Sequence, residues 1–249
     1  MGSLIVGSSF AKGLSLKYNL PLIPVNHIDG HIYSGCLEDK TLDFPFVSLV
    51  VSGGHTSLFL VKSYVDYNIR GMTKDDAAGE AFDKVARMLD LGHAGGAAVA
   101  KLAALGNASR FQLPRPMLNR PGLEFSFSGL KTHSLTTWQK SDQTEQDKAN
   151  IAYAFQEAVV DTLSIKCKRA LEAVDAERLV IAGGVGANKR LREKLNELKA
   201  EVFFPPMQYC TDNGAMIAYA GAIRLKAGET EEPVILPKPR WSLEELTVV

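Results

Sequence analysis

The sequence predicts an α/β protein, because short β-rich runs alternate with helical patterns along its 249 residues. Two apolar runs at residues 44–51 and 56–61 flank a Ser-Gly-Gly-His turn, and a third predicted strand occupies residues 179–182. The clearest helix covers residues 148–174, where large apolar side chains recur along one stripe.

The remaining elements are predicted from periodicity and from glycine and proline signals. In chain order they are a helix end and short strand within residues 14–25, helices at 26–36, 75–91 and 93–106, a helix after residue 188, a strand at 202–204 and a helix at 214–225. Residues 108–133 contain Pro114, Pro116 and Pro121 and are predicted to form a loop that crosses between two halves of the chain.

Composition indicates a globular protein with a sizeable core. Hydrophobic residues make up 46% of the chain and charged residues 22%. Lys+Arg and Asp+Glu each number 28, so the formal net charge is zero. This neutral charge gives no electrostatic argument that the chain binds nucleic acid. No apolar run approaches the ~20 residues of a membrane helix, so no membrane association is expected. The cysteines show no close spacing, which favours a reducing, cytoplasmic setting.

The first candidate site is the pair His27 and His31. On a helix, side chains four residues apart share one face, so both imidazoles can reach one metal. Such a pair needs a further ligand, often a carboxylate, and on its own it is more often a surface or packing feature. The zincin protease pattern requires Glu directly after the first histidine, and Ile28 stands there, which argues against a metalloprotease. The other histidines gain no partner from spacing and are expected to be surface or packing residues: His55, His93 and His133.

Two glycine-rich segments are candidates for binding phosphate or nucleotide. Residues 52–56, Ser-Gly-Gly-His-Thr, have amides that can bind an anion, although a simple hairpin turn is the favoured interpretation. Residues 183–188, Gly-Gly-Val-Gly-Ala-Asn, follow a buried strand and precede a basic helix, which is a usual position for a nucleotide. Asn188 is equally suited to capping that helix and to bonding a ribose or base.

Acidic residues supply the remaining candidates. Asp76, Glu80 and Asp83 share one face of a predicted helix and suit ribose hydroxyls or an ammonium group, but acids at a helix start can simply complement its dipole. Asp212 precedes the last predicted helix, where capping is its simplest role.

Six segments of this chain, taken in their order along the sequence, resemble motifs of the TsaD family. These are the tRNA N6-adenosine threonylcarbamoyltransferases, formerly called O-sialoglycoprotein endopeptidases or glycoproteases. The matching segments are residues 25–31, 51–56, 75–84, 125–132, 182–188 and 210–216. The resemblance covers essentially the whole chain, and the His-Thr pair after the two glycines is similar to the bacterial or organellar branch.

The resemblance implies a two-lobed ASKHA fold, the architecture of actin, heat-shock chaperones and sugar kinases, with ligand between the lobes. Residues 1–107 would be the remainder of the first lobe, 108–133 the crossing loop and 134–249 the second lobe. It further implies that one divalent metal, Fe²⁺ in preference to Zn²⁺, is held by His27, His31 and Asp212. Threonylcarbamoyl-AMP would lie against Val50, Val51, Ser52, Gly53 and Gly54, with Asp83 and Gly96 at its nucleoside and Asn188 at its adenine end.

The implied reaction transfers threonylcarbamoyl from threonylcarbamoyl-AMP to N6 of adenosine 37, 3′ of the anticodon, in tRNAs that read codons beginning with A. The product is t6A, no residue is expected to be a covalent nucleophile, and TsaB- and TsaE-like accessory proteins are the implied partners. The family's usual opening, Glu-x-Ser-Cys-Asp-Asp-Thr, is absent before Gly2, so we expect the first lobe to be truncated at its N-terminus, as a fragment or through a misassigned start codon. The alternatives are a non-catalytic remnant that binds nucleotide or a partner and a sugar kinase or ATPase of the same fold. A metalloprotease is a further alternative, which Ile28 argues against.

Overall fold

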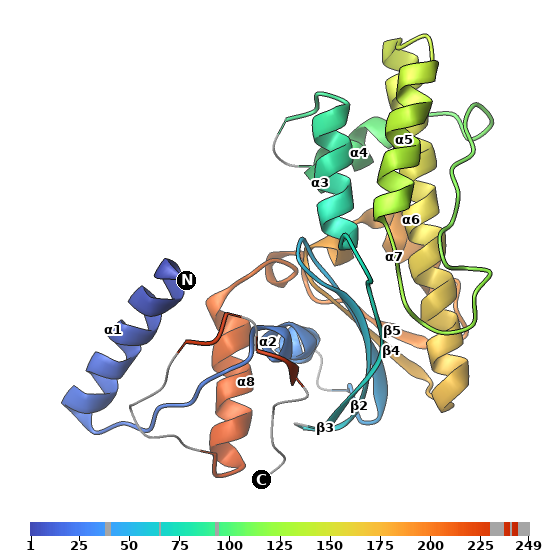
Figure 1. Ribbon diagram of the computed structural model, residues 1–249. Helices are drawn as coiled ribbons and strands as arrows, with labels where there is room; N and C mark the ends of the chain where they lie inside the picture. The colour runs from blue at the N-terminus through green and yellow to red at the C-terminus, as the bar shows by residue number, and fades with distance from the viewer. Residues whose placement is uncertain (38–40, 65, 93–94, 230–236, 240, 244–249) are drawn as a thin grey trace.

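The computed structural model describes residues 1–37, 41–64, 66–92, 95–229, 237–239 and 241–243, so His93 lies outside the described residues. Its centre is a five-stranded sheet in the order β3-β2-β1-β4-β5 (Figure 1). The strands are β1 (Phe46–Val51), β2 (Thr56–Ser63), β3 (Asp66–Met72), β4 (Arg178–Ala182) and β5 (Glu201–Phe203). Strands β1, β2 and β3 pair antiparallel, whereas β1 pairs with β4 and β4 with β5 in parallel. The predicted α/β class is confirmed.

Alternate residues of the central strands are buried on opposite faces of the sheet. Along β1, Val47, Leu49 and Val51 belong to one hydrophobic core. Phe46 and Val50 belong to a second core on the other face. Because a strand directs successive side chains to opposite faces, burial on both sides requires a nearly continuous apolar run, which β1 has.

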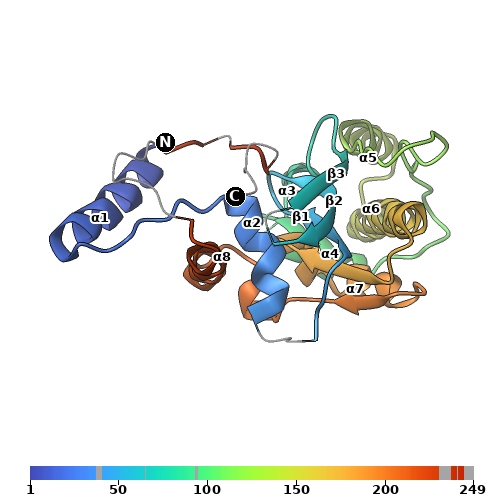
Figure 2. The ribbon, with the colours of Figure 1, turned by 90° about the horizontal axis from the view of Figure 1, so that it is seen from below.

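Helices cover both faces of this sheet (Figures 1 and 2). The larger core is formed with α3 (Ala78–Met88), α4 (Gly95–Ala103), α5 (Ser128–Lys140), α6 (Glu145–Val174) and α7 (Lys189–Asn196). On the other face lie α2 (His27–Tyr33) and, packed against it, α8 (Gly214–Lys226). Helix α1 (Gly2–Tyr18) lies beyond α8, on the side away from the sheet, and none of the described helices is both long and apolar enough to cross a bilayer.

The predicted strand within residues 14–25 is wrong, since the segment between α1 and α2 is irregular apart from one bridge residue, Leu22. Pro21 and Pro24 lack the N–H groups that a strand would use for pairing. Strand β3 was not predicted, because as an edge strand it is mostly half-buried or exposed and has no apolar run.

Helix α5 begins inside the predicted crossing loop because a distant carboxylate caps it. The side chain of Asp75 accepts hydrogen bonds from the N–H groups of Phe127 and Ser128 at 2.8 and 3.2 Å. It also accepts the hydroxyls of Ser126 and Ser128 at 2.6 and 2.7 Å. A carboxylate on the first N–H groups of a helix is a strong cap, and this one is supplied from about 50 residues away.

The Asp75 cap predicts a pH-dependent contribution to stability. Burial alone would raise the pKa of Asp75, but the bonds from Ser126, Ser128 and two backbone N–H groups lower it overall. A lowered pKa in the folded state means that the stabilisation is present above the ordinary carboxyl pKa of 3.8 and is lost as the pH falls through the folded value. Asp75→Asn should therefore reduce the free energy of unfolding by about 1 kcal/mol at pH 7, since the site is exposed, and by less below about pH 4.

Urea unfolding at both pH values measures this difference. The exposed Asp142, which pairs with the exposed Arg110, provides the control Asp142→Asn, expected to change stability by less than about 0.5 kcal/mol. A difference between wild type and Asp75→Asn that does not depend on pH would contradict the cap.

Candidate metal centre

Helix α2 begins at His27 because the residue before it is an effective cap. The side-chain oxygen of Asn26 accepts the N–H of Ile28 at 2.9 Å, and its amide nitrogen donates to the carbonyl oxygen of Trp241 at 2.7 Å. The helical spacing brings the rings of His27 and His31 together, with centroids 4.7 Å apart. The helix predicted over residues 26–36 is thus confirmed as α2 followed by a short 3₁₀ turn, Ser34–Leu37.

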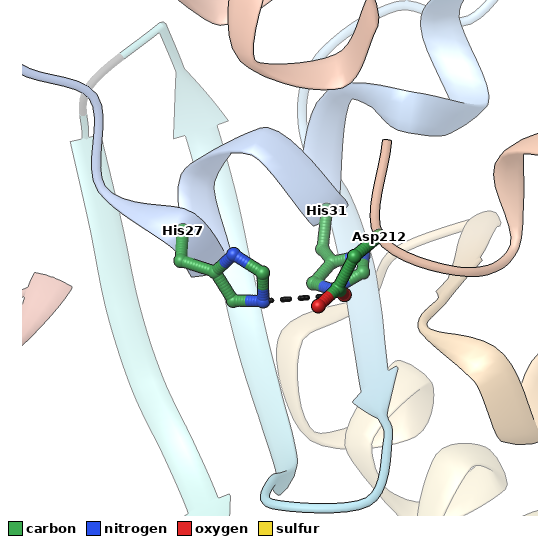
Figure 3. A group of neighbouring side chains, drawn as sticks. All are labelled: His27, His31 and Asp212. Atoms are coloured by element: carbon green, nitrogen blue, oxygen red, sulfur yellow. Dashed lines mark hydrogen bonds and ion pairs between the residues drawn. The ribbon is translucent and has the colours of Figure 1, made fainter. Parts of the chain in front are cut away.

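The third group, Asp212, comes from the segment just before α8. Oδ1 of Asp212 lies 3.1 Å from Nε2 of His31 and 3.4 Å from Nε2 of His27 (Figure 3). The three ligand atoms lie within 4.8 Å of one another. The His31 side chain is 1% exposed, whereas those of His27 and Asp212 are 49% and 76% exposed, so the cluster is open on one side.

These residues form a suitable donor set for a divalent transition metal. Two imidazoles and one carboxylate on one side of an ion leave positions free on the other, an arrangement found with Fe²⁺ and Zn²⁺. Burial lowers the pKa of His31, and the charge of the neighbouring His27 lowers it further while Asp212 opposes both. His31 is consequently neutral at pH 7, with a nitrogen lone pair available to a ligand.

His55 also lies in the electrostatic field of this cluster, which the sequence did not predict. Partial burial lowers the pKa of His55, the charge of His27 lowers it further, and Asp212 raises it. No helical or strand spacing relates His55 to the His27 pair, so only its place beside the two glycines signalled a site.

The two glycine-rich turns meet at one edge of the sheet. Val50 of β1 is paired in parallel with Ala182 of β4, so both strands end on the same side. At Gly183 the backbone φ is +90°, and a Cβ there would lie 2.5 Å from the carbonyl oxygen of Val51. A Cβ on Gly184 would lie 3.8 Å from Thr211, the residue before Asp212, so the second turn adjoins the metal cluster.

The first turn is tied to its own serine and to helix α3. The hydroxyl oxygen of Ser52 accepts the N–H of His55 at 3.2 Å and that of Gly54 at 3.4 Å. The carbonyl oxygen of Ser52 accepts the N–H of Gly79 at 3.2 Å, and a Cβ on Gly79 would approach that oxygen to 2.5 Å. Gly53 and Gly54 are exposed with open space around them, so a ligand can approach their backbone.

The TsaD family model, described as tRNA N6-adenosine threonylcarbamoyltransferase, matches residues 1–219. The chain belongs to this family. Two proteins of that name, from Legionella pneumophila strains Corby and Lens, are each 50% identical to it over 248 residues, which cover 98% of this chain and 74% of each relative.

Two solved structures share the fold of this TsaD-family chain. T. kodakarensis HypF matches with a TM-score of 0.69 at 15% identity, over 92% of this chain and 40% of that one. Full-length HypF in a phosphate- and nucleotide-bound form matches with a TM-score of 0.68 at 17% identity, over 87% and 38%. The chain therefore spans less than half of either HypF, and the likeness supports the two-lobed, ASKHA-type fold.

Three other predicted site residues of the TsaD-family chain have side chains that are already bonded or buried within the protein. Asn188 caps α7 by accepting the N–H of Leu191 at 3.0 Å and donates to Gln156 at 3.0 Å, so both polar ends of its side chain have partners. The side chains of Val50 and Val51 are fully buried, which leaves only their backbone for a ligand.

The predicted helix face of Asp76, Glu80 and Asp83 is wrong for Asp76, because α3 begins only at Ala78, and these acids are partly neutralised within the chain. Lys84 pairs with Asp76 and Glu80, each at 2.8 Å, whereas Asp83 is exposed. A Cβ on Gly95 would lie 2.3 Å from the Asp83 carboxylate, whereas Gly96 faces open space. Gly95 is thus the glycine packed against Asp83, while the predicted contact of Asp83 and Gly96 with a nucleoside stays a prediction.

Basic residues of the segment before α5 and of α5 itself have carboxylate partners. Arg115 binds Asp161 through Nε and Nη2 at 3.1 and 2.7 Å, and Lys131 lies 3.1 Å from Asp76. Arg110 pairs with Asp142 at 3.2 Å. These pairs reduce the positive charge that the loop and α5 present to solvent.

The close approach of the ends of β1 and β4 predicts that alanine substitutions at the adjacent glycines Gly183 and Gly184 differ strongly in their effect on the free energy of unfolding. Gly183→Ala forces a side chain into a left-handed conformation against Val51 and should lower the free energy of unfolding by about 2–3 kcal/mol. Gly184→Ala, with ordinary contacts, should change it by less than about 0.5 kcal/mol. Urea unfolding compares the two, and equal losses would contradict the close approach of β4 to β1.

Proposed function

We propose that this chain transfers the threonylcarbamoyl group from threonylcarbamoyl-AMP to N6 of adenosine 37 in tRNAs that read codons beginning with A, forming t6A. Family membership supports the reaction. The observation that supports an active site at this edge of the sheet is that His27, His31 and Asp212 lie together there, beside the two glycine turns. In sequence, the two parts would be residues 1–107 and 134–249 with the crossing segment at residues 108–133 between them; α5 begins within that segment at Ser128, and both parts contribute strands to the one sheet.

His27, His31 and Asp212 would hold one divalent metal, Fe²⁺ in preference to Zn²⁺. When bound, the metal supplies a Lewis acid that polarises the carbamoyl oxygen or stabilises charge on the phosphate. The buried His31 fixes the inner side of the site, and the exposed Asp212 leaves the outer side accessible to substrate.

Threonylcarbamoyl-AMP would lie along the edge where β1 and β4 end. Val50 and Val51 would contribute backbone groups, and the turn from Ser52 to Gly54 would approach the phosphate. Its nucleoside would lie near Asp83 and Gly96, with Asn188 toward the adenine. The HypF structure with bound phosphate and nucleotide supports the use of this fold for such a ligand.

The chemistry requires no covalent intermediate. The N6 amine of adenosine forms a bond to the carbamoyl carbon, the bond from that carbon to the phosphate oxygen breaks, and AMP leaves with the electron pair. The proton lost from the amine is taken up by the departing phosphate or by water. The protein would hold the two substrates in contact and exclude competing water.

The neutral chain would rely on partners to capture tRNA. Its formal net charge is zero, and several cations near the crossing loop are paired with carboxylates. We therefore include tRNA and TsaB- and TsaE-like accessory proteins in the proposal, in the cytoplasm and without a membrane.

Removal of a proposed ligand tests this function. His31→Ala should lower the metal content from about one ion per chain and reduce t6A formation by about 100-fold or more, because several kcal/mol of charge stabilisation are lost. The assay combines purified protein, accessory proteins, threonylcarbamoyl-AMP and unmodified tRNA, followed by mass analysis of nucleosides and elemental analysis of the protein.

The exposed His133 provides the matched control, because His133→Ala removes an imidazole on α5 outside the cluster. Full t6A formation by His31→Ala would exclude the proposed site. Nucleotide binding without t6A formation by the wild type would instead favour a non-catalytic binding protein, and peptide cleavage would favour a protease.

A further inference from the structure

The two halves of the metal cluster come from segments that are 181 residues apart, from His31 to Asp212. The histidines belong to α2, whereas Asp212 is followed at once by Asn213, which caps α8 by accepting the N–H of Met216 at 2.9 Å. The position of Asp212 is therefore set by α8. The spacing of the ligands depends on how α2 and α8 are held together.

The two helices approach closely at a glycine in the middle of α2. A Cβ on Gly30 would lie 2.9 Å from Ile217 and 3.3 Å from Met216, both on the first turn of α8. The figures show α8 beside α2 on the outer side of the sheet (Figures 1 and 2). This packing restricts how α2 and α8 can move against each other, and a directional interaction between the two helices restricts it further.

A buried ion pair supplies that interaction on the far side of α2. Asp29 lies two residues from each histidine, so at about 100° per residue its side chain leaves the opposite face of the helix. Nε of Arg224 donates to its Oδ2 at 2.9 Å, and the two side chains are 1% and 4% exposed. The segment from Asp212 to Arg224 is almost wholly helical and about 18 Å long, which is enough to reach from one side of α2 to the other.

Further bonds make this pair rigid. Nη1 of Arg224 donates to Glu229 at 2.7 Å, just beyond the end of α8. The hydroxyl of Tyr67, on β3, donates to the other carboxylate oxygen of Asp29. The carboxylate thereby ties α2 to α8 and to the sheet at once. A buried, hydrogen-bonded charge pair has little freedom to rearrange, because breaking it leaves an unpaired charge in the interior.

We propose that Arg224 is a positioning residue of the metal centre, whose buried ion pair with Asp29 fixes α2 against α8 and holds His27 and His31 opposite Asp212. The inference rests on the proposed metal site. Arg224 contacts neither the metal nor the substrates, and acts only through the geometry of the three ligands.

Titration of the purified chain with Co²⁺ tests the proposal, since the visible spectrum of Co²⁺ reports its coordination geometry. Arg224→Gln should bind Co²⁺ about 10-fold more weakly, the lower end of the loss seen when a partner bonded directly to a ligand is removed, and its spectrum should change. Arg224→Lys keeps a cation opposite Asp29 and should recover part of the affinity. Circular dichroism establishes folding, and if Arg224→Gln does not fold, the altered spectrum is sought in Arg224→Lys.

The matched control is Arg115→Gln, which removes an ion pair of similar length, 2.7 Å to Asp161, from the other side of the sheet. It should lower stability without changing Co²⁺ affinity. Wild-type affinity and spectrum in the folded Arg224 variant, or equal weakening in Arg115→Gln, would overturn the positioning role. A wild type that binds no Co²⁺, or binding that survives His31→Ala, would instead refute the metal centre itself.

Discussion

The parallel hydrogen bonding between β1 and β4 is the constraint on which the candidate site depends. It joins strands from the two halves of the sequence and makes both end at one edge of the sheet. The two glycine turns are there because those strands end there, and Gly183 allows the backbones to come within a distance that no side chain tolerates. The metal cluster adjoins the same edge through Thr211.

The cluster combines a fixed inner side with an open outer side. His31 is buried, whereas Asp212 is largely exposed. The proposed metal centre would need both properties, because its ligands must be held in place while two substrates, one of them a tRNA, reach it. The exposed glycines at residues 53 and 54 lie at the end of β1 and leave that edge open.

The sequence predicted most of the regular elements because their signals are local. The apolar run of β1 and the stripe of α6 depend on periodicity, and both lie where they were expected. The start of α5 could not be predicted, because its cap is Asp75, far away in the chain. Edge strand β3 was missed for lack of an apolar run.

In the candidate site, too, local features could be predicted and contacts between distant residues could not. The spacing of His27 and His31 follows from one helix and was predicted from residues alone, whereas Asp212 was joined to them only by resemblance to a family. Its position depends on the packing of α8 against α2, which no local pattern encodes. The proximity of His55 and the two partners of Asn188 are tertiary contacts of the same kind.

His27 and His31 on α2 and Asp212 before α8 are proposed to bind one metal ion together. X-ray absorption at the metal edge of the purified, metal-loaded protein tests this most directly, because imidazole rings give a distinct outer-shell signal. We expect two imidazole ligands with nitrogen distances near 2.0–2.1 Å for Zn²⁺ in the wild type, one imidazole in His27→Gln, and two imidazoles in Asp212→Ala. A spectrum without imidazole scattering, or one that His27→Gln leaves unchanged, would contradict it.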